Sequence, residues 1–238
     1  MMSLLTPRRR YEAELLDSHS EDEALVLRSV EDIERSNFFF QGVRAAVAEL
    51  RLHFADLPEY ATLLDVGTGM GDVPEAAERA AAQRGIRLDT LGLDTVAALS
   101  RRASECVTHA VCGSGLALPF RSESVDIVMC SQTLHHFREE DESVLVREMN
   151  RVARVAVVVS DLRRSWIAAA GFWAASFPLR FHPVTRHDGV LSVLRGFTPA
   201  ELGATVERAI GVTPRVHSRL GFRLTTSWKP VRREVALA

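Results

Sequence analysis

The pattern of apolar and polar positions along the chain changes near residue 60. Residues 1–36 are rich in charges of both signs and only weakly patterned, which is typical of a surface helix or an arm. Apolar residues then recur at helical spacing from Phe38 to Phe54, so a helix is predicted there. Beyond residue 60, short apolar runs alternate with helical segments. The runs predict strands over 61–66, 88–93, 108–112, 125–130 and 155–160, and the segments predict helices over 74–84, 96–103 and 139–151.

This alternation predicts an α/β fold with a doubly wound, mostly parallel sheet, because parallel strands need helical crossovers of this length. Residues 162–198 interrupt it with an apolar helix followed by a predicted loop over 181–196. Insertions that follow strand ends in such folds commonly cover the ligand crevice. We therefore expect 162–198 to form a helical lid.

The last part of the chain resumes the pattern with a helix over 198–210, where Thr198 and Glu201 have the spacing of a capping box. Strands are predicted over 214–219 and 222–228, and only two residues separate them. So short a connection requires an antiparallel hairpin. The expected organisation is an N-terminal helical extension over 1–59, then one α/β domain over 60–238 that contains the lid.

Composition narrows the class of protein. The chain has 238 residues, of which 47% are hydrophobic and 25% charged, as in an ordinary globular protein. With 29 basic and 31 acidic side chains, no basic field would drive nucleic-acid binding. The three cysteines form no CxxC pair, the start lacks the apolar run of a signal peptide, and the most apolar stretch, 166–179, is too short to span a bilayer. We expect a cytoplasmic protein without a transmembrane segment.

The segment Leu63–Asp72, with sequence LLDVGTGMGD, carries the strongest chemical signal. A buried strand delivers Asp65, and three glycines at alternate positions let the backbone turn tightly beside a ligand. Asp94 follows 23 residues after Gly71, at the end of the next predicted strand. An acidic side chain at that place accepts hydrogen bonds from ribose hydroxyls. The segment therefore predicts a nucleotide-like ligand.

This segment and three others resemble class I S-adenosylmethionine-dependent methyltransferases. The glycines of the first segment are spaced GxGxG, as in that family, rather than GxGxxG as in dinucleotide-binding proteins. Residues 113–120, GSGLALPF, resemble the family's GDA-x-x-LPF loop, and 124–130, SVDIVMC, its FDVV strand. Residues 131–137, SQTLHHF, resemble the LHH turn of the branch that contains ubiquinone and menaquinone methyltransferases. The resemblance covers about 60–161 and implies the seven-stranded Rossmann-like methyltransferase fold, whose last strand suits the predicted hairpin.

The resemblance implies S-adenosylmethionine as the cofactor. The residues that match the family's cofactor-binding positions are Asp65, Gly67, Thr68, Gly69, Gly71, Asp94, Thr95, Ser114, Gly115, Cys130, Ser131 and Gln132. By this resemblance the glycines and Asp65 hold the methionyl part, and Asp94 holds the ribose. Ser114 and Gly115 lie at the adenine edge, and the turn over 130–132 closes over the sulfonium. Ser114 departs from the family, which usually has an acid there, so adenine recognition is altered.

A hydroxyl acceptor needs a base to remove its proton. Candidates near the predicted strand ends and in the lid are His135, His136, Asp161, His187 and Asp188. The two adjacent histidines cannot share one helix face, so we expect at most one of them in the pocket. His187 and Asp188 lie in TRHDG, which is also a turn sequence, and Asp161 is also placed to cap a helix. No acidic cluster with metal-ligand spacing is present, so no metal is expected.

These observations predict an enzyme that methylates a small apolar or aromatic acceptor, at a phenolic, quinone-like or polyketide-like hydroxyl of the kind found in secondary metabolism. Carbon methylation of an enol or quinol ring has the same requirement for a base. A protein that keeps the cofactor without transferring methyl would carry the same motifs. A nicotinamide oxidoreductase is disfavoured by the GxGxG spacing and the hairpin. We expect a monomer or homodimer that acts on a small molecule and not on nucleic acid.

Overall fold

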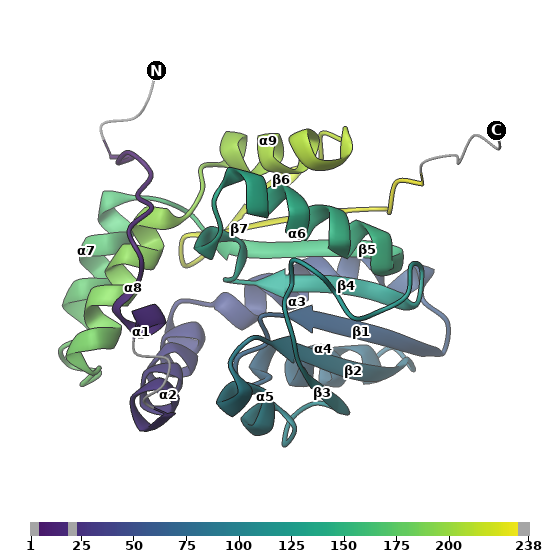
Figure 1. The fold of residues 1–238 in the computed structure, drawn as a ribbon, viewed down its shortest axis with the longest axis horizontal. Helices are drawn as coiled ribbons and strands as arrows, with labels where there is room; N and C mark the ends of the chain where they lie inside the picture. The colour runs from purple at the N-terminus through teal and green to yellow at the C-terminus, as the bar shows by residue number, and fades with distance from the viewer. Residues whose placement is uncertain (1–4, 19–22, 233–238) are drawn as a thin grey trace.

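A seven-stranded sheet forms the centre of the structure, a computed structural model that describes residues 5–18 and 23–232 (Figure 1). Its strands are β1 (Tyr60–Val66), β2 (Arg87–Asp94), β3 (His109–Cys112), β4 (Val125–Ser131), β5 (Ala153–Leu162), β6 (Val216–Arg219) and β7 (Arg223–Trp228). They lie side by side in the order β3-β2-β1-β4-β5-β7-β6. Strands β1 to β5 pair in parallel, and β7 is antiparallel to both β5 and β6. The predicted fold class and the terminal hairpin are confirmed.

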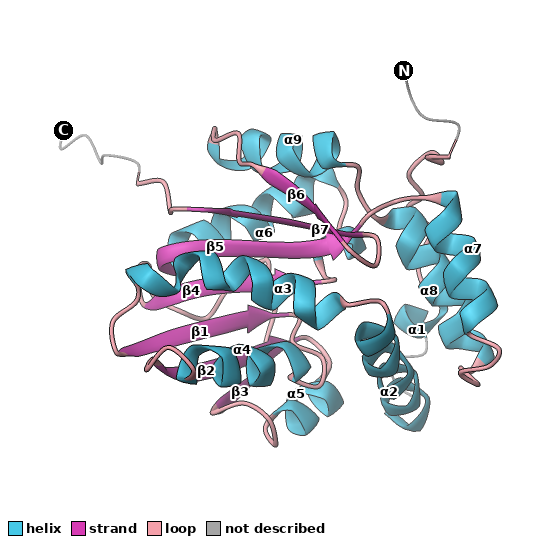
Figure 2. Cartoon of the chain, turned by 180° about the vertical axis from the view of Figure 1, so that it is seen from behind, coloured by secondary structure: helices cyan, strands magenta, loops and turns pink. Residues whose placement is uncertain are grey.

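Helices cover both faces of this sheet and its carboxyl edge. They are α1 (Leu15–Ser18), α2 (Glu23–Phe39), α3 (Gly42–Leu50), α4 (Asp72–Ala82), α5 (Ala97–Ala103), α6 (Glu139–Val152), α7 (Trp166–Ala175), α8 (Pro183–Arg195) and α9 (Pro199–Ile210), with short 3-10 helices η1 (Arg51–Asp56) and η2 (Leu134–His136). Helices α3 and α4 cover one face of the sheet, and α6 and α9 cover the other (Figures 1 and 2). Because both faces are buried, the central positions of β4 and β5, 127–130 and 155–159, are continuously apolar.

Most element boundaries agree with the predicted ones to within a few residues. The capping box of α9 is present: the Thr198 hydroxyl accepts from the Glu201 N–H, and the Glu201 carboxylate accepts from the Thr198 N–H. This reciprocal pair satisfies two backbone donors that the first helical turn leaves without partners. The helix therefore begins where the sequence predicts.

The predicted loop over 181–196 is wrong, because residues 183–195 form α8. Pro183 suits the first helical turn, and the His182 side chain accepts from the Val184 N–H. Gly189, predicted as part of a turn, lies inside the helix against the ring of Phe172, where a Cβ would collide with that ring. Packing against α7 therefore overrides the local turn signal of TRHDG.

The N-terminal extension is more buried than its charge pattern predicts. Helix α2 lies beside α8, and the buried carboxylate of Asp32 accepts from the backbone N–H of His182 at 2.7 Å. Together α1, α2, α7 and α8 form a helical layer over the carboxyl ends of the parallel strands (Figures 1 and 2). Within the described part of the chain, no helix has the length and apolarity that crossing a membrane requires. The extension thus contributes to the edge where ligands bind in such sheets.

Glu49 connects α3 to the terminal hairpin through hydrogen bonds. Its fully buried carboxylate accepts from Thr225 Oγ1 at 2.6 Å, Arg219 Nη2 at 2.7 Å and Ser227 Oγ at 2.8 Å, and lies 3.0 Å from His217 Nδ1. Burial raises the pKa of Glu49, but these hydrogen bonds outweigh it and hold the pKa below its ordinary value. The ionised form is therefore the one that stabilises the fold.

We expect Glu49→Ala to lower the free energy of unfolding by about 2–3 kcal/mol at pH 7, because it leaves the buried hydroxyl of Thr225 and the half-buried guanidinium of Arg219 without their acceptor. The Glu49 pKa is lowered by folding, so its contribution is present above the unfolded-state pKa and is lost as the pH falls through the folded-state value. Urea unfolding at pH 7 and pH 4 should thus show a smaller pH effect in the variant than in the wild type. Glu78→Ala, on the exposed face of α4, is the control; an equal loss there would contradict the prediction.

Candidate active site

A cavity of about 510 Å³ lies between the carboxyl ends of the strands and the helical layer. One half is lined by the glycine turn after β1 and by the ends of β2 and β4. The other half is lined by α2, α7, α8, η2 and the turn of the hairpin. Its volume is in the range usual for small-molecule sites. The site is therefore built by residues from both ends of the chain.

The turn after β1 has the strained backbone that only glycine adopts readily. Gly67, Gly69 and Gly71 all have positive φ angles, of 74°, 56° and 85°. The N–H groups of Gly67 and Thr68 both donate to the carbonyl of Leu93, which ties the turn to the end of β2. A Cβ at Gly69 would meet no atom within 4 Å, so this residue leaves open space for a ligand to approach the backbone.

Three polar side chains beside the glycine turn have buried atoms without a hydrogen-bond partner: Asp65 Oδ1, Thr68 Oγ1 and Ser131 Oγ. All three residues line the cavity. Burial raises the pKa of Asp65 well above its ordinary value; the nearby Thr68 side chain opposes this effect, and the carboxylates of Asp72 and Asp94 add to it. Buried polar atoms are normally paired, so this cluster is suited to a polar ligand group. A bound ammonium would supply the missing donors.

Asp94, at the end of β2, both lines the cavity and supports the glycine turn. Its Oδ2 accepts from the Gly69 N–H at 3.1 Å, and its Oδ1 accepts from the Val96 N–H at 2.9 Å. Burial raises the pKa of Asp94, and these backbone hydrogen bonds, which lower it, only partly offset that effect. Each carboxylate oxygen still has a further lone pair, so a pair of ligand hydroxyls remains compatible with this arrangement.

His135 and Asp161 form a buried dyad at the ends of β4 and β5. His135 Nδ1 lies 2.7 Å from Asp161 Oδ1, and the His135 backbone N–H donates to Asp161 Oδ2 at 3.2 Å. An ionised carboxylate only accepts, so Nδ1 carries a proton. In the neutral imidazole the lone pair is then on Nε2. Burial raises the pKa of Asp161, but the charge and hydrogen bonds of His135 outweigh it and keep the pKa low. His135 lines the cavity, and its Nε2 is buried without a partner.

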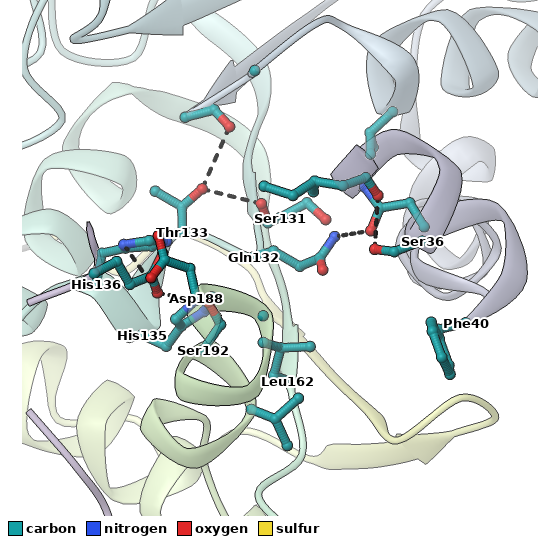
Figure 3. A pocket seen from close by; sticks show the side chains of 18 of the residues that line it. Ser36, Phe40, Ser131, Gln132, Thr133, His135, His136, Leu162, Asp188 and Ser192 are labelled. Atoms are coloured by element: carbon teal, nitrogen blue, oxygen red, sulfur yellow. Dashed lines mark hydrogen bonds and ion pairs between the residues drawn. The ribbon is translucent and has the colours of Figure 1, made fainter. Parts of the chain in front are cut away.

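Both adjacent histidines line the cavity, which corrects the expectation that at most one would. Residues 134–136 form a 3-10 turn, not an α-helix, and the two imidazole rings lie 4.4 Å apart (Figure 3). Desolvation by the surrounding protein, with His135 and Arg195 nearby, lowers the pKa of His136 well below its ordinary value, although 35% of its side chain is exposed.

Ligand atoms of Glu14, His135 and His136 lie within 4.8 Å of one another, a set that has the chemistry to hold a metal ion. Glu14 is already engaged, because its Oε1 accepts from Ser192 Oγ at 2.6 Å and lies 3.8 Å from Arg195 Nη1. The guanidinium of Arg195 also donates to the carbonyls of both histidines. This fixed positive charge opposes a second cation at the same place.

The structure brings most of the predicted site residues together. Those that line the cavity are Asp65, Gly67, Thr68, Gly69, Asp94, Thr95, Gly115, Ser131, Gln132, His135, His136 and Asp188. Those outside its lining are Gly71, Ser114, Cys130, Asp161 and His187. Asp161 nevertheless acts on the cavity through His135, and Gly71 begins α4.

The remaining outliers have local structural contacts. Ser114 is exposed, and its hydroxyl accepts from the Leu116 N–H within its own turn. Cys130 is wholly buried in the sheet core. The side chain of His187, on α8, is 55% exposed and lies outside the cavity lining. Asp188 lines the cavity, but its two oxygens accept from the N–H groups of Leu15 and Leu16 and so cap α1.

Sequence reasoning missed the part of the wall that comes from α2 and the hairpin. Ile33, Phe40 and Phe222 contribute apolar surface there, and Arg223 contributes a buried cation. The aromatic run that ends α2 was the available signal. No sequence signal pointed to Arg223, because its position over the cavity depends on the pairing of the hairpin strand β7 with β5.

Residues 64–158 match the family model described as a methyltransferase domain. A search of the curated proteins finds no match. Among solved structures, a SAM-dependent methyltransferase from Aquifex aeolicus is 17% identical, with a TM-score of 0.54 over 78% of this chain and 89% of that chain.

Two further structures share the fold. Magnesium protoporphyrin IX methyltransferase from Synechocystis, with bound SAH, is 16% identical, with a TM-score of 0.53 over 84% of this chain and 86% of that chain. Human N-acetylserotonin methyltransferase, in complex with SAM, is 12% identical, with a TM-score of 0.62 over 94% of this chain and 63% of that chain.

Residues 64–158 are similar to a methyltransferase domain, and the solved structures share the fold of the whole chain. The cofactor that agrees with both findings is S-adenosylmethionine. The residues present fit that group. The open space over Gly69, the unpartnered atoms of Asp65 and Thr68, and the carboxylate of Asp94 are suited to its polar ends. The apolar side chains of Val96 and Leu99 complete this half of the cavity.

We expect Asp94→Ala to weaken binding of S-adenosylhomocysteine by about 1.5–3 kcal/mol, because a charged acceptor is lost and the Gly69 N–H loses its partner. Isothermal titration calorimetry of the folded variant measures this. Asp89→Ala, exposed on the same strand, is the matched control. An unchanged dissociation constant in Asp94→Ala would refute the assignment.

Proposed function

We propose that this protein transfers a methyl group from S-adenosylmethionine to a hydroxyl of a small, flat, apolar acceptor. The observation that carries the proposal is His135, whose buried Nε2 has no partner in the described chain while Asp161 holds its Nδ1. A hydroxyl acceptor is the chemical group that such a nitrogen would bind and deprotonate.

The cofactor supplies an electrophilic methyl group on a sulfonium. Asp65, Thr68 and the glycine turn would hold its methionyl part, and Asp94 its ribose. In the proposed reaction, His135 Nε2 accepts the acceptor's hydroxyl proton, and Asp161 stabilises the resulting imidazolium. Arg195 keeps the turn of His135 and His136 in place through their carbonyls, and the enclosing helices exclude water.

The lining of the second half of the cavity favours an aromatic acceptor. Phe40, Phe172 and Phe222 lie in its wall, and the rings of Phe40 and Phe172 are 5.8 Å apart. Flat apolar molecules gain contact area against such rings. We infer that 162–198, which include α7 and α8, act as the lid over this acceptor.

Carbon methylation of an enol or quinol is the second candidate, because the same dyad would remove the corresponding proton. A protein that retains the cofactor without transferring methyl is the third. Calorimetry with S-adenosylhomocysteine and NAD, followed by measurement of S-adenosylhomocysteine release with phenols and quinols, separates these functions. Binding of NAD alone would overturn the methyltransferase, and cofactor binding without turnover on a broad panel would favour the third.

We expect His135→Asn to lower the turnover number about 10²–10⁴-fold, because the general base is removed, and Asp161→Asn to lower it by disturbing the histidine tautomer. Binding of S-adenosylhomocysteine should be preserved in both variants. His109→Asn, exposed on β3 and outside the cavity, is the control. Wild-type turnover in His135→Asn would remove this residue as the base.

A further inference from the structure

Arg223 is a buried cation in the cavity wall. It is the first residue of β7 and is 2% exposed. Its Nη1 donates to Gln132 Oε1 at 2.6 Å, and its Nε donates to the Phe40 carbonyl at 3.4 Å. Both acceptors are neutral. Within 5–18 and 23–232, no carboxylate forms an ion pair with this guanidinium, and its Nη2 makes no hydrogen bond.

Two other buried arginines show how the fold normally treats this side chain. Arg164 donates to the carbonyls of Pro7 and Gly196 and to the carboxylate of Glu201. Arg195 donates from all three nitrogens to backbone carbonyls and lies beside a carboxylate. Neither lines the cavity, whereas Arg223 does. Its remaining donors are therefore available to a ligand.

The charge of Arg223 persists at neutral pH. Burial lowers its pKa to about 10, and the nearby carboxylates of Asp161 and Asp72 limit the decrease. Both carboxylates have other partners: Asp161 accepts from His135 and the Leu162 N–H, and Asp72 accepts from Asn37 and the Val73 N–H. A buried cation without a paired anion is costly, so an anionic ligand would stabilise it.

The surrounding backbone fixes the guanidinium of Arg223 in the wall of the cavity. Phe222 and Gln132 have positive φ angles of 55° and 54°, which are strained for residues with a side chain. At Gly221 a Cβ would overlap the carbonyl oxygen of Phe40, so the hairpin turn packs directly on the end of α2. The Gln132 side chain also donates to Asn37 Oδ1 at 2.5 Å. Three elements thus fix the position of the guanidinium.

We propose that Arg223 binds a carboxylate of the acceptor, so that the substrate class is an aromatic or similarly flat hydroxy acid. The inference rests on the proposed function and deepens it. In Figure 3, His135 and His136 lie at one end of the site, and Gln132 and Phe40, the two partners of Arg223, lie farther along. The acceptor would span the two groups, with its hydroxyl at His135.

The methionyl carboxylate of the cofactor is the other carboxylate that Arg223 could bind. The position in the sheet favours the acceptor, because β7 is separated from β1 by β4 and β5. Three strand spacings amount to about 14 Å between the backbones of β1 and β7, and the side chain of Arg223 covers part of that distance to reach Gln132. The glycine turn and Asp94 lie on the β1 and β2 side of that distance.

The test measures binding of 4-hydroxybenzoate and of its neutral analogue 4-hydroxybenzamide to the whole protein saturated with S-adenosylhomocysteine. We expect the wild type to bind the carboxylate at least tenfold more tightly than the amide. Arg223→Gln should reduce that preference below threefold, and Arg223→Lys should keep part of it. Arg215→Gln, exposed on the same hairpin and outside the cavity, should leave it unchanged.

The affinity of the same variants for S-adenosylhomocysteine shows whether Arg223 binds the carboxylate of the acceptor or that of the cofactor. A tenfold loss of this affinity in Arg223→Gln, with the benzoate preference retained, would assign Arg223 to the cofactor and overturn the proposal. Equal wild-type binding of the two probes, or no binding of benzoate, would also overturn it without needing a folded variant. Because the readout is binding, a preference for benzoate in a protein without turnover would support Arg223 while contradicting the proposed methyl transfer.

Discussion

The parallel alignment of the central strands is the constraint on which the rest of the structure depends. It brings Asp65, Asp94, Ser131 and Asp161 to one edge of the sheet, where all but Ser131 are buried. A buried carboxylate is costly unless it has partners. Asp94 takes backbone N–H groups of the glycine turn and Asp161 takes His135, whereas Asp65 keeps an unpartnered oxygen. The site therefore supplies hydrogen-bond partners to the buried carboxylates of Asp94 and Asp161. For Asp65 we expect a ligand to supply the missing partner.

The helical layer above this edge is held together by contacts between distant parts of the chain. Asp188 of α8 caps α1, Asp32 of α2 accepts from the backbone before α8, and Asn37 of α2 bonds to Gln132 after β4. Each contact pairs a buried polar group with a partner more than ninety residues away. Helices α2, α7 and α8 therefore line one half of the cavity jointly.

The parts of the site that sequence reasoning predicted well are those set by local chemistry. Gly67, Gly69 and Gly71 have the positive φ angles that their spacing predicts, and Asp94 reaches the turn from the next strand. His135 and Asp161 were candidates only as strand-end residues, and their bond depends on the parallel pairing of β4 with β5. For α8 the local signals were misleading, because burial of Leu191 and Leu194 outweighs the turn preference of TRHDG.

The sequence by itself determined the alternating α/β order, the terminal hairpin, the glycine turn and the acid that follows it. These features follow from periodicity and from the conformational freedom of glycine, which act over a few residues. Only the tertiary structure decided that His135 is held by Asp161, that α2 lines the cavity, and that Arg223 reaches it with no acidic partner among the described residues. These features depend on strand order and on helix packing between remote segments, and no local pattern encodes either.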